Sequence, residues 1–144
     1  MSGVEGIRTG IHVCRGNWSR REDVLLEGDY TPLVPAFSAM QVDQFVLEYA
    51  TPRAGDVAVV GAALGHREIG LGVVNPRTDE AEPVEEIVAR AERALAYFAP
   101  ERVFLNPDCG FACFAHRGVN DEHHATEKLR HIAQAARVLR ERHG

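Results

Sequence analysis

The sequence predicts an α/β protein in which parallel strands alternate with helices. Three observations predict this class: four short apolar runs, a helical or loop segment after each run, and polar side chains where the runs end. Parallel neighbours need a crossover connection, so this alternation indicates a parallel sheet with helices packed on it. At 144 residues and 45% hydrophobic, the chain is long enough for one domain and too short for two. We therefore expect a single domain over residues 1–144.

The first half of the chain contains two expected strands and one helix. The first strand is expected over 7–14, and the second, QFVLEY, over 44–49. Between them Thr31 opens a helix with Pro32 at its first position. The apolar face of that helix is expected to comprise Leu33, Phe37 and Met40. A short segment rich in Ala and Val leads on to the third strand.

The second half repeats the strand and helix order twice. The third strand is expected over 69–74 and the fourth over 102–105. Pro83 starts the clearest helix of the chain, which ends at Pro100. Its apolar residues recur at helical spacing: Val84, Ile87, Val88, Ala91, Leu95 and Phe98. A last helix carries an apolar stripe of Ala125, Leu129, Ile132, Ala136 and Leu139.

Composition excludes several classes of partner. Charged residues make up 26% of the chain and the formal net charge is -5, so no basic surface is expected for nucleic acid or for anionic lipid. The first ten residues lack a basic region followed by an apolar run, and no window approaches the roughly 18 apolar residues of a membrane span. We expect a soluble, cytoplasmic protein. Three cysteines without an export signal argue for metal binding or reactive thiols rather than for disulfides.

Four side chains that can bind a ligand lie at the expected strand ends, namely Cys14, Glu48, Asn75 and Cys109. In parallel α/β sheets ligands gather at the carboxyl ends of the strands. His12 is two residues before Cys14 and therefore points to the same face of an extended strand. These residues are expected to converge at one edge of the sheet.

Each of these residues also has a simpler interpretation. His12 would be a hydrogen-bonded core residue and Cys14 a small buried side chain. Glu48 would pair with Arg53, and Cys109 would be a turn cysteine before Gly110. Convergence favours the metal hypothesis, because one His, two Cys and one Glu form a plausible tetrahedral set for zinc.

The ligand charges predict the chemistry of such a site. Two thiolates and one carboxylate make zinc a poor Lewis acid for water but a good holder of a further thiol as thiolate. A substrate thiol would displace Glu48 or expand the ligand shell, lose its proton near neutral pH and attack an activated methyl group. A zinc hydrolase that uses bound water is the lesser alternative.

Four segments, IHVCRGN, FVLEY, GLGVVNPRT and VFLNPDCGF, resemble the C-terminal catalytic domain of the cobalamin-independent methionine synthase family. The resemblance spans nearly the whole chain and is strongest to the short, single-domain branch, in which HxCRGN, LEY and CGF recur in this order. It implies zinc held by His12, Cys14, Glu48 and Cys109. It also implies an S-methyltransferase activity like that of 5-methyltetrahydropteroyltriglutamate-homocysteine methyltransferase, from a methylated folate or related donor to homocysteine, giving methionine.

One departure from the family pattern concerns the proton donor. Long methionine synthases carry a proton-donating His in a DIHSP loop, where this chain reads NPRT and places Arg77 close to Asn75. Arg77 cannot donate a proton at neutral pH. Another group must therefore protonate the leaving nitrogen of a folate, or the methyl donor differs. His66, His116, His123 and His124 are substitutes by residue type, although a solvated loop or a helix cap is the simpler role for each.

A second departure is size. The family fold is a (β/α)8 barrel of about 250 residues, and this chain matches only its strands 5 to 8, which is half of a TIM barrel. The open edges of such a half predict pairing with a second copy or with a separate N-terminal half-barrel chain, unless the chain is a truncated gene product. A non-catalytic half-barrel that retains zinc, or that requires a partner for activity, is the alternative function.

Three further patterns receive simple interpretations. Gly70-Leu71-Gly72 is too short for a dinucleotide fingerprint and indicates close strand packing. Cys113 is expected on an apolar turn with Phe111 and Phe114. The mixed charges of SRRED, over 19–23, indicate a solvated surface segment.

Overall fold

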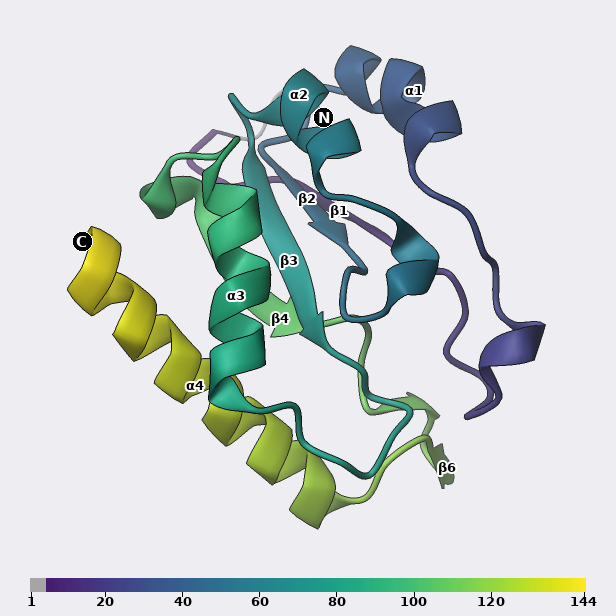
Figure 1. Ribbon diagram of the computed structural model, residues 1–144. Coiled ribbons are helices and arrows are strands. Elements are labelled where there is room, and N and C mark those ends of the chain that lie inside the picture. The colour runs from purple at the N-terminus through teal and green to yellow at the C-terminus, as the bar shows by residue number, and fades with distance from the viewer. Residues whose placement is uncertain (1–4) are drawn as a thin grey trace.

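A computed structural model describes residues 5–144, so the first four residues of the expected domain lie outside the described part. Its main sheet has four parallel strands in the order β1-β2-β3-β4, which is also their order in the chain (Figure 1). The strands are β1 Gly10–Val13, β2 Gln44–Leu47, β3 Glu68–Val74 and β4 Val103–Pro107. The predicted α/β class with parallel βα units is confirmed.

Helical segments connect the strands. The α-helices are α1 Val34–Ala39, α2 Ala58–Leu64, α3 Val84–Leu95 and α4 Glu122–His143. Four short 3-10 helices accompany them: η1 Glu22–Val24, η2 Thr31–Leu33, η3 Pro52–Ala54 and η4 Pro100–Arg102. Thr31 and Pro32 begin a helical segment as predicted, and η2 runs directly into α1. Of the residues expected on its apolar face Phe37 is buried, whereas Leu33 is 40% exposed.

The predicted strand limits are right to within a few residues. The largest difference is in the first strand, which was expected over 7–14 but pairs with β2 only over Gly10–Val13. The preceding Thr9 is held instead by Asp43, whose Oδ2 atom accepts from its backbone N–H at 2.7 Å and from its hydroxyl at 2.8 Å. Cys14 consequently lies one residue beyond β1 rather than inside it.

Two elements were not predicted. Helix α2 is only seven residues long, too short to show helical periodicity, and Gly61 in its middle disfavours a helix by propensity. A Cβ atom on Gly61 would lie 2.5 Å from the Tyr97 side chain, so glycine permits a close approach here. The second element is an antiparallel pair, β5 Ala112–Phe114 and β6 Arg117–Gly118. Cys113 therefore lies in an exposed hairpin strand rather than on the expected apolar turn.

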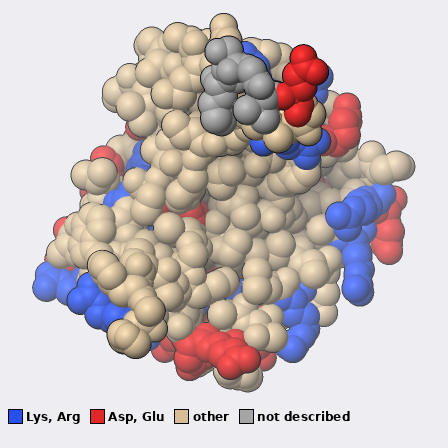
Figure 2. Space-filling view, turned by 180° about the vertical axis from the view of Figure 1, so that it is seen from behind, with Lys and Arg blue, Asp and Glu red and all other residues tan. Residues whose placement is uncertain are grey.

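The two faces of the main sheet differ in burial. One face packs against the helices and forms the core together with Ile87, Val88 and Ile132 of α3 and α4. Its central row is Ile11, Phe45, Ile69 and Val103. The opposite face carries the next row in register, which is His12, Val46, Gly70 and Phe104. Viewed from behind, the molecule shows mainly uncharged atoms over its centre, with charged side chains gathered towards the periphery (Figure 2).

The buried face of helix α4 differs from the predicted stripe at one position. Leu129, expected on the apolar stripe, is 49% exposed, whereas Ile132 is buried as predicted. Lys128 and Ala135 are fully buried in its place. The Lys128 ammonium group is satisfied by the backbone carbonyl of Glu80 and by the Glu82 carboxylate at 3.2 Å. Apolar periodicity therefore located the helix but misplaced the edge of its buried face, because an internal ion pair occupies one turn.

The edges of the sheet are open within residues 5–144, since β1 pairs only with β2 and β4 only with β3. Beside the β4 edge lies a groove of about 660 Å³ between α3, α4 and β4. Apolar residues dominate its lining, among them Leu95, Phe104, Ile132 and Leu139. No helix of the described part is both long enough and apolar enough to cross a membrane.

Candidate metal centre

Three side chains of metal-binding type meet at the carboxyl ends of β1 and β4. The ligand atoms of His12, Cys14 and Cys109 all lie within 4.8 Å of one another. The two Sγ atoms are 3.6 Å apart. His12 belongs to β1, Cys14 follows it directly, and Cys109 comes two residues after the end of β4. The parallel strands end on the same side of the sheet, and the segments after β1 and β4 bring together residues that are far apart in the chain.

The His12 ring is oriented by a backbone group. Its Nδ1 atom lies 3.0 Å from the carbonyl oxygen of Val46 in the neighbouring strand. A carbonyl can only accept, so Nδ1 carries the proton and donates it. The Nε2 atom then keeps its lone pair, which is the form of imidazole that binds a metal ion.

The thiol of Cys14 is supported by the turn that follows it. The backbone N–H of Gly16 lies 3.3 Å from Cys14 Sγ and donates to it. Gly16 has φ 117°, a backbone conformation that favours glycine. A Cβ atom at this position would also lie 2.6 Å from the Trp18 ring. Glycine is thus required for the turn that aims an N–H group at the sulfur.

The thiol of Cys109 is half-buried, and its surroundings oppose ionisation. Burial, followed by the contact with Cys14, raises the pKa of Cys109 to about 12. Without a cation this sulfur is a neutral thiol at neutral pH. Metal binding at this place would therefore release a proton.

The donor set fits zinc. Zinc–sulfur bonds of about 2.3 Å at a tetrahedral angle place two sulfur atoms roughly 3.8 Å apart. The observed separation of the Sγ atoms, 3.6 Å, is close to that value. One imidazole nitrogen and two sulfurs supply three of the four ligands that zinc takes in proteins. The borderline-soft zinc ion prefers this mixture of nitrogen and sulfur, whereas magnesium or calcium would need oxygen.

Glu48, the expected fourth ligand, lies next to this group but is engaged elsewhere. It is 1% exposed and follows β2 directly. Its Oε1 atom accepts from the Arg15 backbone N–H at 2.8 Å, and its Oε2 atom is 3.3 Å from Arg53 Nη2. The salt bridge between Glu48 and Arg53, considered as the simpler interpretation, is present. Metal binding by Glu48 stays a prediction.

Asn75 and Arg77, in the loop after β3, are both buried. The side chain of Arg77 is fully buried, and its Nη1 atom donates to the Gly16 carbonyl at 3.3 Å. Its Nη2 atom lies 3.7 Å from Oδ2 of Asp108, the residue before Cys109. Arg77 is thus next to both cysteine segments without belonging to the ligand group.

Asp108 is fully buried and ties the ends of two strands together. Its Oδ1 atom accepts from the backbone N–H groups of Tyr49 at 2.9 Å and Ala50 at 2.8 Å. Burial raises the pKa of Asp108 to about 7, the charge of Glu48 adds to the rise, and the two backbone hydrogen bonds and Arg77 oppose it. This role was not predicted, because nothing in NPDCG indicates which strand the aspartate contacts.

Glu22 contradicts the prediction that SRRED is only a solvated segment. Its carboxylate lies between two arginines, 3.0 Å from Arg77 Nε and 3.3 Å from Arg53 Nε. Partial burial would raise the pKa of Glu22, yet hydrogen bonds from Arg77 and Asn75 and the arginine charges lower it overall. No local signal could have revealed this, because its partners lie more than thirty residues further along the chain.

Cys113 and the remaining histidines lie outside the ligand group. Cys113 Sγ contacts the Asn17 carbonyl at 3.0 Å. His124 is at the start of α4, where Asp121 caps the helix by accepting from its backbone N–H at 2.9 Å. Asp121 is therefore the capping residue, and His124 belongs to the first turn that it caps. The Gly70-Leu71-Gly72 pattern is likewise explained by packing, since a Cβ atom on Gly72 would lie 2.2 Å from Asp108 Oδ1.

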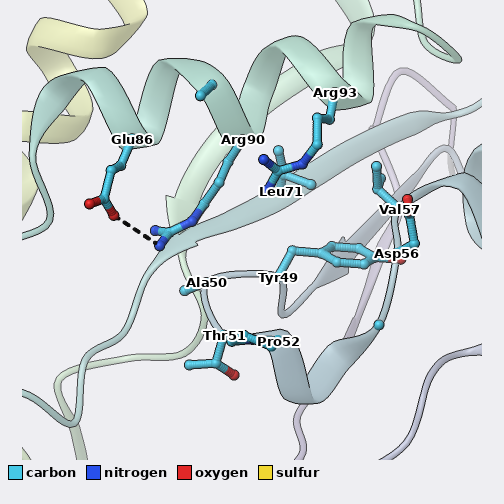
Figure 3. A pocket seen from close by; sticks show the side chains of 12 residues that line it. Tyr49, Ala50, Thr51, Pro52, Asp56, Val57, Leu71, Glu86, Arg90 and Arg93 are labelled. Carbon is cyan, nitrogen blue, oxygen red and sulfur yellow. Dashed lines mark hydrogen bonds and ion pairs between the residues drawn. The ribbon is translucent and has the colours of Figure 1, made fainter.

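A second hollow, of about 560 Å³, lies on the helix side of the sheet between α3 and the loop after β2. Arg90 and Arg93 extend from α3 into the space beside Leu71, and Tyr49 and Thr51 line it from the loop (Figure 3). Arg90 is already occupied, donating to the Val73 carbonyl at 2.6 Å and pairing with Glu86 at 3.4 Å. His12, Cys14 and Cys109 are absent from its lining, so the hollow is separate from the candidate metal centre.

Fold and site together define the class of protein, an α/β domain with a nitrogen and sulfur ligand group at the carboxyl ends of parallel strands. A family model described as the catalytic domain of cobalamin-independent synthase matches residues 7–138. The chain therefore belongs to the cobalamin-independent methionine synthase family, as its motifs indicated.

Curated relatives support this membership. The chain is 33% identical over 134 residues to a methionine synthase of Pyrococcus abyssi, with 93% of this chain and 34% of the relative aligned. It is 34% identical over 139 residues to the methionine synthase of Pyrococcus furiosus, which covers 95% of this chain and 36% of the relative. The chain thus spans about a third of the length of the curated relatives it matches.

Solved structures show the same fold. A B12-independent methionine synthase from Shewanella sp. W3-18-1, in complex with selenomethionine, superposes with a TM-score of 0.80 at 17% identity. That match covers 98% of this chain and 40% of the other. A putative B12-independent methionine synthase from Listeria monocytogenes gives a TM-score of 0.67 at 24% identity, covering 96% and 36%. The chain accordingly has the fold of part of the barrel of these proteins.

Proposed function

We propose that this chain carries the zinc-binding part of a methyltransferase that transfers a methyl group to a thiol, with homocysteine as the acceptor and methionine as the product. The proposal rests on one observation above all, the convergence of His12, Cys14 and Cys109 within 4.8 Å. Family membership and the names of the relatives support the reaction.

The three converging side chains would hold the zinc ion, and Glu48 would be the fourth, exchangeable ligand. When bound, zinc supplies a positive charge that stabilises a substrate thiolate near neutral pH. Because the Nδ1 atom of His12 already contacts the Val46 carbonyl, the Nε2 atom would be free to bind the ion without a change of tautomer.

Glu48 suits an exchangeable role because alternative partners are in place. When its carboxylate leaves the ion, the Arg15 N–H and the Arg53 guanidinium can receive it, as both contacts exist in the structure. A buried carboxylate without such partners would cost several kcal/mol. Glu48→Gln should therefore keep the fold and weaken zinc binding, because an amide is a poorer zinc ligand than a carboxylate, while a thiol should still be able to take the fourth position.

The methyl donor is proposed to be a methylated folate or a related compound. Arg77 does not protonate it, since its guanidinium keeps its charge at neutral pH and its side chain is fully buried. The donor site would then be completed by residues from a further part of the barrel.

We infer that this further part is a complementary set of βα units, supplied by a second copy of this chain, by a separate N-terminal half-barrel or by a longer protein of which this chain is a piece. The open edges of β1 and β4 support this inference, because unpaired strand edges bind other strands. The apolar groove beside β4 supports it as well. Light scattering of the purified chain, alone and mixed with the N-terminal half of a relative, would test which partner binds.

Zinc content tests the proposal directly. The purified chain should bind one zinc ion, Cys109→Ser should lose most of it, and Cys113→Ser should keep it because Cys113 lies outside the ligand group. When homocysteine is added, its thiol should lose a proton to the solution. The zinc X-ray absorption spectrum should then show one more sulfur ligand. Absence of zinc from the wild type, or its retention in Cys109→Ser, would refute the proposal.

A second candidate function is a non-catalytic half-barrel in which zinc is purely structural. This candidate rests on the same ligand group, which would hold zinc whether or not a thiol can bind to it. Zinc that binds in full but acquires no sulfur neighbour from homocysteine, with or without the complementary half, would establish this alternative.

A further inference from the structure

Arg77 is the largest fully buried side chain of residues 5–144, and its guanidinium contacts both segments that carry the cysteines. Nη1 donates to the carbonyl of Gly16, two residues after Cys14, and Nη2 faces Asp108, the residue before Cys109. We propose that Arg77 and Asp108 are positioning residues that hold the two thiols at the spacing of a two-sulfur metal site. This inference rests on the zinc site proposed above and deepens it.

On the Cys14 side, Gly16 links Arg77 to the sulfur. Its carbonyl accepts from Arg77 at 3.3 Å, and its own N–H donates to Cys14 Sγ at 3.3 Å. A displaced arginine would release the carbonyl and free the turn to rotate. The N–H that supports the Cys14 sulfur would rotate with it.

On the second side, Asp108 is held from three directions. Its backbone N–H donates to the Val74 carbonyl at 2.9 Å, and its Oδ1 atom accepts from Tyr49 and Ala50. Of its two side-chain oxygens, Oδ2 lacks a hydrogen bond, and that atom faces Arg77 Nη2, which lacks one too. The separation of 3.7 Å is too long for a hydrogen bond, but it allows electrostatic attraction between the guanidinium and the ionised form of the fully buried carboxyl group.

Arg77 is itself anchored from outside the ligand group. Its Nε atom donates to Glu22 at 3.0 Å, its backbone N–H donates to Asn75 Oδ1 at 3.0 Å, and its carbonyl accepts from Arg20 Nε at 2.9 Å. A planar guanidinium with donors in several directions can make the Glu22, Gly16 and Asp108 contacts at once. A lysine, with one compact ammonium group, cannot span them.

Two conservative variants test the positioning role. Arg77→Lys keeps the buried charge but removes the forked donors. Asp108→Asn keeps an oxygen for the Tyr49 and Ala50 N–H groups and removes the charge that faces Arg77. Lys128→Met is the matched control, because Lys128 is also a fully buried cation and holds the same loop through Glu82 without contacting a cysteine segment.

Cobalt binding provides the spectroscopic readout, because a Co2+ ion substituted for zinc reports thiolate ligands through charge-transfer absorption. We expect Arg77→Lys and Asp108→Asn to bind Co2+ about 10-fold to 100-fold more weakly and with a weaker thiolate band, while far-UV circular dichroism stays like that of the wild type. Lys128→Met should lower the unfolding midpoint and leave the band unchanged. Unchanged affinity in both site variants would overturn the proposal, and so would an equal loss in Lys128→Met.

A metal-free measurement separates this inference from the zinc proposal. In a glutathione buffer Cys14 and Cys109 can each lose a proton and together give two electrons to glutathione disulfide, which is reduced to two glutathione molecules. The equilibrium constant for this protein disulfide depends on how the thiols are positioned. We expect this equilibrium constant to fall at least about tenfold in Arg77→Lys. The measurement is made well below the unfolding temperature of the variant, so that a lower stability of the fold does not affect it.

The two readouts fail in different ways. If the wild type takes up no cobalt but the disulfide constant still falls in Arg77→Lys, the zinc proposal fails and the positioning role stands. If the constant is the same in both proteins, the positioning role is refuted whatever the metal result. Asp108→Asn is measured in the same way should Arg77→Lys not fold.

Discussion

Cys14 Sγ and Cys109 Sγ lie 3.6 Å apart although the two residues are 95 positions apart in the chain. β1 and β4 are the two outer strands of the sheet, so this proximity depends on the segments after their carboxyl ends, where Cys14 and Cys109 both lie. A pair of thiols at this distance can bind one ion, and it can also be oxidised.

The first prediction concerns that oxidation. A disulfide needs a sulfur separation of about 2.05 Å, so a closure of roughly 1.5 Å suffices. Metal-free protein treated with glutathione disulfide should lose two of its three free thiols, and peptide mapping should find Cys14 joined to Cys109. Zinc added beforehand should protect both thiols. In Cys113→Ser two thiols should still be lost, and a bridge that involves Cys113 would contradict the prediction.

The second prediction concerns Gly72. A Cβ atom there would lie 2.2 Å from Asp108 Oδ1 and 2.9 Å from the Leu47 carbonyl. Since two backbone N–H groups hold Oδ1 in place, Gly72→Ala should destabilise the fold by about 2–3 kcal/mol in urea unfolding. Gly10→Ala is the control, because its nearest atom would be 3.6 Å away, and it should change stability by less than about 0.5 kcal/mol. Equal unfolding midpoints in the two variants would disprove the steric argument.

The third prediction concerns Arg53, whose side chain is 9% exposed and lies 3.3 Å from both Glu48 and Glu22. Arg53→Met leaves Glu48 buried without its cation, so the free energy of unfolding should fall by about 3 kcal/mol in the metal-free protein. Added zinc should restore part of the loss if Glu48 binds the ion. Arg21, in an exposed pair with Asp23, is the control, and Arg21→Met should leave the midpoint unchanged. A midpoint equally unaffected in Arg53→Met would show that the Glu48 contact does not stabilise the fold.

The fourth prediction concerns acid stability at the start of α4. Hydrogen bonding from the His124 backbone N–H lowers the pKa of Asp121. A carboxyl with a lowered folded-state pKa stabilises the fold above its ordinary pKa, and this contribution is lost as the pH falls through the folded-state value. Between about pH 6 and about pH 3 the thermal midpoint of the wild type should therefore fall further than that of Asp121→Asn, which can still cap the helix. Parallel curves for the two proteins would rule out this contribution.

Much of the fold could be predicted because it depends on local patterns. The four strands were found from apolar runs, and helices α3 and α4 from apolar residues at helical spacing. Both patterns involve residues close together in the sequence and indicate which side chains are buried. Helix α2 could not be found in this way, since seven residues around Gly61 show no periodicity. Leu129 was misplaced because Lys128 is buried through an ion pair with Glu82, which hydrophobicity does not reveal.

The sequence by itself determined the residue types of the ligand group and their places at strand ends, since a His two residues before a Cys on a strand must share its face. Tertiary structure alone decided two relationships: the burial of Arg77 beside both cysteine segments, and the tie from Asp108 to Tyr49 and Ala50. The physical reason is that hydrogen bonds and ion pairs act over a few ångströms in space. Which groups come within that range depends on strand order and register, and a local sequence pattern does not encode them.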